Sequence, residues 1–280
     1  HDSNGPNPPV YAATSPVSPS GASTTPLIRG TVGTDIQTVT VYTDASCTMQ
    51  TGTGTAEDFR TTGIQVTATA NGSISYYAVA TDDKMVPSDC TFLTIFTHDS
   101  VAPASPVFVA TTPTSPTRTT LVPRISGTAS ADTQQIRIFN NSTCSNIVGS
   151  GTKAVFEGSG IPASIMANEI TTLYGVASDA AGNMSACIAL TTFEHDTIPP
   201  DPPVFGLSVP SSPNNQSTTP RIQGTTDITA VDVKLYNDES CTNLIGSGST
   251  AAFDSPGIQV TVTGNTTTTL YATSDDTAGN

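Results

Sequence analysis

The chain has 280 residues, only 11% of them are charged, and the formal net charge is −14. This acidity excludes nucleic acids and anionic lipids as expected partners, because both bind proteins through a basic surface. No apolar run approaches the roughly 20 residues that span a bilayer, so we expect no membrane insertion in this segment.

A repeat of 97 residues organises the chain. Its histidines recur in the dipeptides His1-Asp2, His98-Asp99 and His195-Asp196. Its cysteines recur in two series, which are Cys47, Cys144 and Cys241, and then Cys90 and Cys187. A fixed period of this length is typical of tandem copies of one domain. We therefore predict domains at residues 1–97 and 98–194 and an incomplete one at 195–280, which lacks its last strand.

The third unit stops before the cysteine that the period places at position 284. We therefore expect this chain to be a piece of a longer array. Neighbouring repeats of the same protein are then the nearest partners of each domain.

The second unit predicts strands throughout. Turn residues and period-2 alternation place them at residues 105–109, 123–127, 135–139, 171–178 and 187–193. Pro106 assigns the first of these to a sheet edge, and no window shows helical periodicity. About seven short strands in about 100 residues is typical of an immunoglobulin-like (Ig-like) sandwich. The sequence thus predicts an all-β fold of tandem Ig-like β-sandwich domains that form an extended rod.

Two segments resemble bacterial Ig-like repeats. Residues 174–185, which read Tyr-Gly-Val-Ala-Ser-Asp-Ala-Ala-Gly-Asn-Met-Ser, look like the TATDAAGNxS segment of those repeats, and residues 195–200 look like their DxxxP linker. The third unit matches with residues 276–280, whereas residues 82–87 of the first unit have lost the Gly-Asn pair. The resemblance implies a stalk in a large surface or secreted protein, including adhesins, some of which bind calcium at domain junctions.

Calcium is the cofactor that this resemblance suggests, at the junctions between units. In an Ig-like sandwich, the linker before a domain and the loop before its last strand lie at the same end, and calcium prefers several oxygen ligands. The candidate ligands are Asp2 and Asp82 in the first unit, Asp99, Asp179 and Asn183 in the second, and Asp196, Asp276 and Asn280 in the third. The alternative is that these residues only form turns, with Gly and Asn at positive φ and the linker aspartates capping the turn before the prolines.

The cysteines allow two disulfide patterns. Local pairing joins Cys47 to Cys90 and Cys144 to Cys187, and leaves Cys241 without its partner. However, the two cysteines of a unit are expected at opposite ends of the sandwich, roughly 26 Å apart if eight strand residues separate them. A disulfide needs Cα atoms within about 7 Å. A bond from Cys47 to Cys187 across the first junction therefore remains an alternative.

Catalysis is not expected, because the only histidines lie at repeat boundaries and no nucleophile or phosphate-binding motif accompanies them. The repeated cysteines favour an oxidising compartment, so we predict an extracellular or bacterial cell-surface location. The predicted function is a structural stalk or fibre segment. The alternatives are an adhesive module that recognises glycans or another cell surface, and a filament subunit completed by a strand from another copy.

Overall fold

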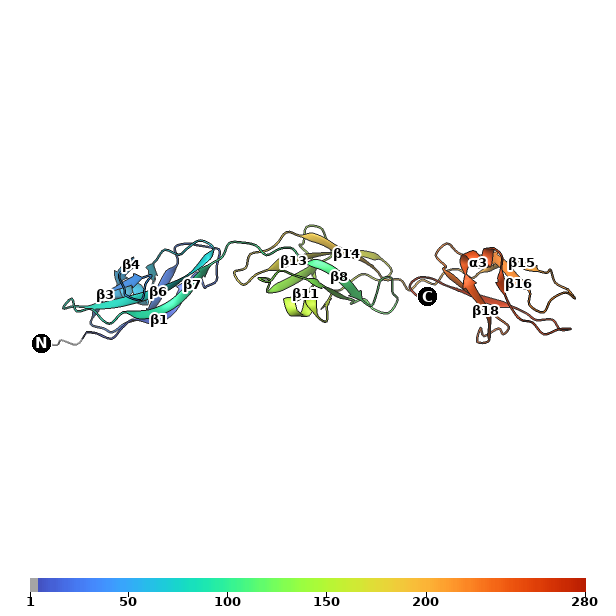
Figure 1. Ribbon diagram of the computed structural model, residues 1–280, viewed down its shortest axis with the longest axis horizontal. Helices are drawn as coiled ribbons and strands as arrows, with labels where there is room; N and C mark the ends of the chain where they lie inside the picture. The colour runs from blue at the N-terminus through green and yellow to red at the C-terminus, as the bar shows by residue number, and fades with distance from the viewer. Residues whose placement is uncertain (1–4) are drawn as a thin grey trace.

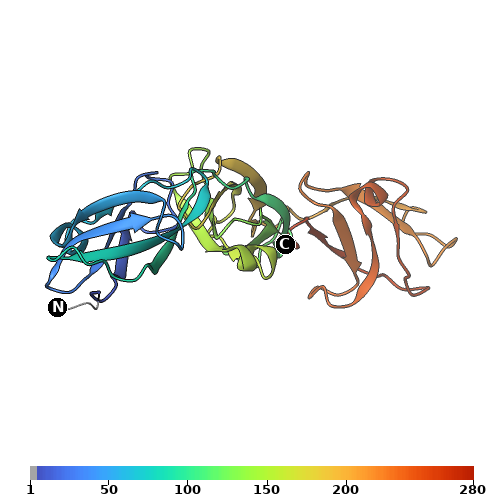
Figure 2. The same ribbon diagram turned by 60° about the vertical axis from the view of Figure 1, so that its left-hand side comes forward.

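The computed structural model describes residues 5–280 and shows three β-sandwich domains in a linear array (Figure 1). The array stays extended when the molecule is turned by 60° (Figure 2). The predicted all-β class and the tandem sandwich arrangement are therefore confirmed. His1 and Asp2 lie outside the described residues, and the predicted domain boundaries stay predictions.

Each of the first two domains packs a three-stranded sheet against a four-stranded sheet, and all strand pairs are antiparallel. In the first domain the sheets have the orders β1-β2-β5 and β4-β3-β6-β7. Their strands are β1 (Val10–Ser15), β2 (Leu27–Thr31), β3 (Ile36–Tyr42), β4 (Gln50–Thr55), β5 (Ile64–Gln65), β6 (Gly72–Asp82) and β7 (Thr91–His98). In the second domain the orders are β8-β9-β12 and β11-β10-β13-β14. Its strands are β8 (Val107–Thr112), β9 (Arg124–Thr128), β10 (Gln135–Phe139), β11 (Ile147–Thr152), β12 (Ile161–Pro162), β13 (Ile170–Ser178) and β14 (Ile188–Glu194).

The third domain has two three-stranded sheets, with the orders β15-β16-β19 and β18-β17-β20. Its strands are β15 (Val204–Val209), β16 (Arg221–Thr225), β17 (Asp232–Tyr236), β18 (Leu244–Ser249), β19 (Ile258–Gln259) and β20 (Tyr271–Asp275). Among the described residues, no strand takes the place that β7 and β14 hold in the other two domains.

Each core lies between the two sheets of its domain. Ile136 and Ile138 of β10 are fully buried, as the alternation of that strand predicts, and Phe193 of β14 closes the same core. The burial of each such side chain contributes about 1.5–3 kcal/mol. The cores are separate clusters, so each domain is held together by its own residues.

One short helix in each domain departs from the all-strand prediction. These helices are α1 (Ala56–Arg60), α2 (Lys153–Glu157) and α3 (Thr250–Asp254). A helix of five residues is shorter than the two turns that a helical period needs to show itself. In α1, Thr55 and Asp58 form a reciprocal capping box, and the ring of Phe59 is fully buried. Local capping and one buried ring therefore form this turn, not amphipathic periodicity.

A glycine that recurs in every unit allows a close approach between the first two strands and the helix. A Cβ on Gly127 would collide with the carbonyl oxygen of Val107 and with the ring of Phe156. Gly30 and Gly224 have the equivalent neighbours in their own domains. Only a residue without a side chain fits there.

In the described part of the chain, no helix has the length and apolar character of a membrane span.

Candidate functional site

The predicted site residues at the joints lie in the linkers and in the loops before the last strands. Asp99 is hydrogen-bonded to both of its neighbouring domains. Its backbone N–H donates to the carbonyl oxygen of Ser20 in the first domain at 3.1 Å. Its own carbonyl oxygen accepts a hydrogen bond from Nδ2 of Asn183, in the second domain, at 2.9 Å. A single linker residue therefore connects the two domains through its backbone.

The second joint repeats this arrangement. The N–H of Asp196 donates to the carbonyl oxygen of Thr117 at 3.1 Å, and its carbonyl oxygen accepts from Nδ2 of Asn280 at 2.9 Å. The same two contacts recur at both joints, so they are a property of the repeat.

On the upstream side, an asparagine and a histidine hold the end of the last strand, an arrangement we call the upstream clasp. Nδ1 of the buried His195 accepts the backbone N–H of Asn168 at 3.2 Å. Oδ1 of Asn168 accepts the N–H and the hydroxyl of Thr197 at 2.8 and 2.9 Å. In the first joint the clasp consists of Asn71, His98 and Ser100, with the same donors and acceptors. The histidines therefore have a structural role at the joints, where each accepts a hydrogen bond.

On the downstream side, the loop before the last strand forms what we call the downstream latch. Asp179 is buried, and its Oδ1 accepts the backbone N–H of Asn183 while its Oδ2 accepts Nδ2 of the same residue, at 2.9 and 2.8 Å. This pair directs the amide of Asn183 toward the carbonyl oxygen of Asp99. Asp276 and Asn280 repeat the contacts in the third domain. Burial raises the pKa of Asp276, but hydrogen bonds from Asn280 and the loop backbone outweigh it and leave the pKa below its ordinary value.

The first unit keeps part of the latch. Oδ1 of Asp82 accepts the backbone N–H groups of Lys84 and Val86 at 2.9 and 2.8 Å. Val86 stands where Asn183 stands in the second unit, so no side-chain amide reaches across. Met85 holds the positive φ of 65° that Gly182 holds at 87° in the second unit. The lost Gly-Asn pair thus removes the side-chain amide of the latch and leaves the turn in place.

The predicted calcium ligands come together in part, but their oxygen atoms are already engaged. Oδ1 of Asp99 accepts the N–H of Val101 at 3.0 Å, so its carboxylate caps its own turn, and Asp196 does the same with Ile198. The amide of Asn183 presents its N–H₂ group to Asp179 and to Asp99. A calcium ion needs oxygen ligands at this point. The described residues form no cluster of three or more His, Cys, Asp or Glu that could hold a metal, and the calcium sites stay a prediction.

The third domain contacts the linker as well. A cleft of about 420 Å³ at the second joint is bounded by the linker and by both domains. Asn168 and Glu169 line it from the second domain, and Asp227 and Thr229 line it from the third. The third domain therefore faces the upstream clasp across this cleft.

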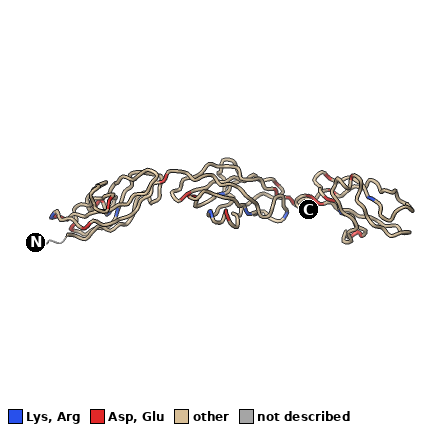
Figure 3. The backbone as a smooth tube through the Cα atoms, viewed as in Figure 1, with Lys and Arg blue, Asp and Glu red and all other residues tan. Residues whose placement is uncertain are grey.

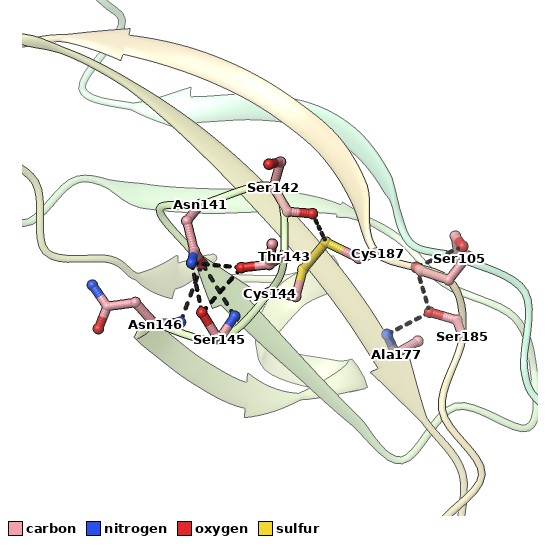
Figure 4. The surroundings of a disulfide bond; sticks show 11 residues. Ser105, Asn141, Ser142, Thr143, Cys144, Ser145, Asn146, Ala177, Ser185 and Cys187 are labelled. Carbon is pink, nitrogen blue, oxygen red and sulfur yellow. Dashed lines mark hydrogen bonds between the residues drawn. A yellow bond between two sulfur atoms is a disulfide. The ribbon is translucent and has the colours of Figure 1, made fainter.

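The two disulfides of the structure are local to their domains. Cys47 pairs with Cys90 and Cys144 pairs with Cys187, with Cα–Cα distances of 5.9 and 6.0 Å. Figure 4 shows the second pair beside the loop that begins at Asn141. Cys241 is free. Two such bonds indicate an oxidising, extracellular-type environment.

The offset of the strands explains why the cysteines meet within a domain. Phe139, the last residue of β10, pairs with Tyr174, and Tyr174 pairs with Ala189 near the start of β14. β10 and β14 therefore flank different halves of β13 and meet only at its middle. The expectation that the two cysteines lie at opposite ends of the sandwich is wrong for this reason, and a bond from Cys47 to Cys187 is not formed.

A polar residue at the start of the cysteine loop holds it in shape. Both carboxylate oxygens of Asp44 accept the N–H of Thr48, and Oδ1 also accepts that of Met49. These bonds, that from Met49 first, hold the pKa of Asp44 below its ordinary value. The pKa of Asp238 is held well below its ordinary value, foremost by a hydrogen bond from the hydroxyl of Ser240. In the second unit the same position is Asn141, whose Oδ1 accepts two backbone N–H groups (Figure 4).

Sequence reasoning missed the asparagines of the upstream clasp. Asn71, Asn168 and Asn265 occupy the same position of the repeat and all have positive φ, of 50°, 55° and 60°. Their recurrence with the 97-residue period is the signal that could have identified them.

Comparison with known proteins finds similar solved structures only at low scores. No family model matches the sequence, and no curated protein matches it either. Similar solved structures include the fibronectin(III)-like modules of Clostridium thermocellum CbhA, at 13% identity over 70% of this chain and 92% of that one, with a TM-score of 0.38. The FN1–FN3 domains of chicken CNTN1 are similar at 10% identity over 99% and 95%, with a TM-score of 0.33. The BSP domain of a biofilm associated protein is similar at 15% identity over 70% and 30%, with a TM-score of 0.22.

At these scores the likenesses carry no argument about function. The sheets described above define tandem β-sandwich domains of the fibronectin type III and Ig-like kind.

Proposed function

We propose that this array is a segment of a stiff stalk in an exported bacterial surface protein. The proposal rests on the backbone hydrogen bonds of Asp99 and Asp196. Their N–H groups donate to the upstream domain, and their carbonyl oxygens accept from the downstream domain. A linker that is hydrogen-bonded on both sides loses the rotations that would let the domains swing.

The linker composition supports the same role. Residues 198–203 of the second joint read Ile-Pro-Pro-Asp-Pro-Pro, and a proline-dense linker is extended and semi-rigid. The local disulfides stabilise small domains whose hydrophobic cores contain few residues. Figure 3 shows acidic residues in all three domains, and their excess over basic residues keeps a long rod soluble.

The long loops favour a spacer over an adhesive module. Residues 111–120 and 210–219 consist mainly of Ser, Thr, Pro and Asn and contain no aromatic side chain. Recognition surfaces are typically anchored by aromatic and arginine side chains, and Arg118 is the one such residue in these two loops. The array is non-catalytic in this proposal.

Small-angle X-ray scattering of the 280-residue chain tests the stalk. The control is a variant in which residues 198–203 become Gly and Ser, which frees the second joint only. We expect the native chain to scatter as one extended conformer and the control to show a smaller mean radius of gyration. Equal curves for the two proteins, both requiring a broad ensemble, would refute the stalk.

A further inference from the structure

The sheet β4-β3-β6-β7 of the first domain has an outer face, turned away from the core, on which aromatic side chains meet. In β3 the side chain of Val41 is buried, so its neighbours Thr40 and Tyr42 point outward. Tyr42 pairs with Tyr77 of β6, and Tyr77 pairs with Phe92 of β7. Three aromatic side chains therefore form a row across three neighbouring strands.

This outer face is apolar and open to solvent. Phe92 is 52% exposed, and Ile95, which pairs with Ser75 of β6, is 54% exposed. The rings of Tyr77 and Phe92 contact each other edge to face, with their centroids 5.6 Å apart. Exposed apolar side chains that adjoin one another, unlike single scattered ones, mark an interaction surface.

The second domain lacks the apolar side chains of β7. At the positions of Phe92 and Ile95 it has Ala189 and Thr192. The second domain forms the same four-stranded sheet with these smaller and more polar residues. The fold therefore does not require Phe92 and Ile95, and the apolar surface is particular to the first domain.

The first domain also lacks a cation at the centre of this face. At the position of Thr40 the second domain has Arg137 and the third has Lys234, and each lies between two buried residues of its strand and so points outward. Within the described strands β3, β4, β6 and β7, Asp82 is the only Asp, Glu, Lys or Arg, and it is buried. The strands therefore give the outer face no charge, although the net charge of the chain is −14.

We propose that this outer face is an interface at which two copies of the chain associate, each through the same face. In such a two-fold contact, a residue near the axis lies opposite the same residue of the other copy. A cation at the centre of the face would then meet a like charge, which weakens association. Thr40 removes that repulsion, and the uncharged face lets two acidic chains approach each other with the least repulsion.

The observations favour a second copy over other partners. An anionic partner would bind better to a face that keeps Arg137 or Lys234 than to one that has lost the cation. A neutral sugar stacks on a flat aromatic surface, but the ring planes of Tyr77 and Phe92 are inclined at 71° and form no such platform. The inference does not depend on the stalk role.

Sedimentation velocity of the full chain over a series of concentrations tests the interface. Every protein carries Cys241→Ser, because the free thiol could otherwise link two chains by a disulfide. One face of a small domain is at the low end of interface sizes, so we expect a weak, reversible dimer. Added salt should strengthen it by screening the net charge. A chain that stays monomeric up to millimolar concentration at both low and high salt would overturn the proposal.

Two variants place residues of the second domain at the same positions of the first, where the fold is known to accept them. Phe92→Ala with Ile95→Thr removes the apolar side chains, and Thr40→Arg restores the cation. An unchanged melting temperature checks that each variant is folded. We expect each to raise the dissociation constant of the dimer at least about tenfold.

Val109→Ala is the matched control. Val109 is 64% exposed and lies on the three-stranded sheet of the second domain, so its loss should leave the dissociation constant unchanged. A dimer with the same dissociation constant in the native chain and in both first-domain variants would place the contact elsewhere and overturn the proposal.

Amide chemical shifts measured on dilution locate the contact. We expect changes at residues 40–42, 75–79 and 92–95, and unchanged shifts at the equivalent residues 137–139, 172–176 and 189–192. Changes at the same first-domain residues when cellohexaose is added to a chain that stays monomeric would overturn the choice of a second copy as the partner.

Discussion

Nδ2 of Asn183 donates to the carbonyl oxygen of Asp99 at 2.9 Å, and Asn280 holds the same relationship to Asp196 at the same distance. In both joints the asparagine is in turn fixed by a buried aspartate, Asp179 or Asp276. A polar side chain inside one domain therefore defines where the backbone of the preceding linker lies. The angle of each joint follows from a hydrogen bond and not only from the stiffness of its prolines.

Asn183→Ala is expected to loosen the first joint and leave the second unchanged. The substitution removes the hydrogen bond to Asp99, which contributes about 1 kcal/mol. Residual dipolar couplings measure the effect, since two rigidly joined domains share one alignment tensor. We expect the tensors of the first and second domains to diverge. Asn280→Ala is the matched control and should loosen only the joint between the second and third domains; unchanged tensors in both variants would exclude the latch as the element that sets the angle.

The loop that begins at Asp44, Asn141 or Asp238 predicts a difference in acid sensitivity between the domains. The pKa values of Asp44 and Asp238 are lowered, foremost by the N–H of Met49 and the hydroxyl of Ser240. A carboxyl whose pKa is lowered on folding stabilises the fold above its unfolded pKa of about 3.9, and this is lost as the pH falls through the folded value. The second unit has Asn141, which does not titrate.

Asp44→Asn should therefore make the melting temperature of the first domain less dependent on pH below about pH 4, and Asn141→Asp should make that of the second domain more dependent. Calorimetry at a series of pH values, with the domain transitions assigned by NMR, measures both. The two variants are mutual controls because they exchange the same pair of side chains at equivalent positions. Identical slopes in the native and variant domains would show that these loops do not contribute to acid stability.

The double variant Cys144→Ser and Cys187→Ser is expected to lower the free energy of unfolding of the second domain by about 2–4 kcal/mol. The bond closes a loop with a sequence separation of 43 residues, and its removal gives the unfolded chain more conformational freedom. Hydrogen exchange of the core amides around Phe156 measures the loss. The first domain, which keeps its own disulfide, is the internal reference, and equal changes around Phe59 would point to a global effect instead.

Much of the fold could be predicted from the sequence, because the repeat presents the same signals several times. The period indicated tandem domains, and the alternation in residues 135–139 placed Ile136 and Ile138 in the core. The helices could not be predicted, since a single turn such as α2 depends on one cap and on the burial of Phe156, and neither leaves a period in the sequence.

The sequence predicted which residues meet at the junction, but it did not predict how they are hydrogen-bonded. The sequence placed Asp99, Asp179 and Asn183 at one junction. It could not show that the amide N–H₂ group of Asn183 faces both oxygen partners, because the orientation of a side-chain amide depends on the three-dimensional loop. The offset of β10 and β14 along β13 could not be predicted from the sequence either, because the register depends on pairing between strands that are distant in the chain. That offset is what brings the cysteines together within each domain.

Gly127→Ala is expected to destabilise the second domain by about 1–3 kcal/mol. The added Cβ would collide with the carbonyl oxygen of Val107 and the ring of Phe156, and neither can move without disturbing a strand pair or the core. Gly264→Ala is the control, because its Cβ would meet only a methyl group of Thr218 at 3.7 Å. Urea unfolding should show a lower midpoint for the first variant alone. A similar midpoint for Gly127→Ala would mean that β8 can separate from β9 at low cost.

Calcium and hydrogen bonding make opposite predictions for Asp179. If the latch is held by hydrogen bonds, the melting temperature of the native chain should be the same in millimolar calcium and in EDTA. Asp179→Ala should then destabilise the second domain by about 1–3 kcal/mol in both conditions, because it leaves the N–H groups of Asn183 without their acceptors. Asp179→Asn keeps one acceptor oxygen and should recover part of the loss. A calcium-dependent rise in melting temperature that both substitutions abolish would instead establish a metal site, and the amide of Asn183 would have to turn its oxygen toward the ion.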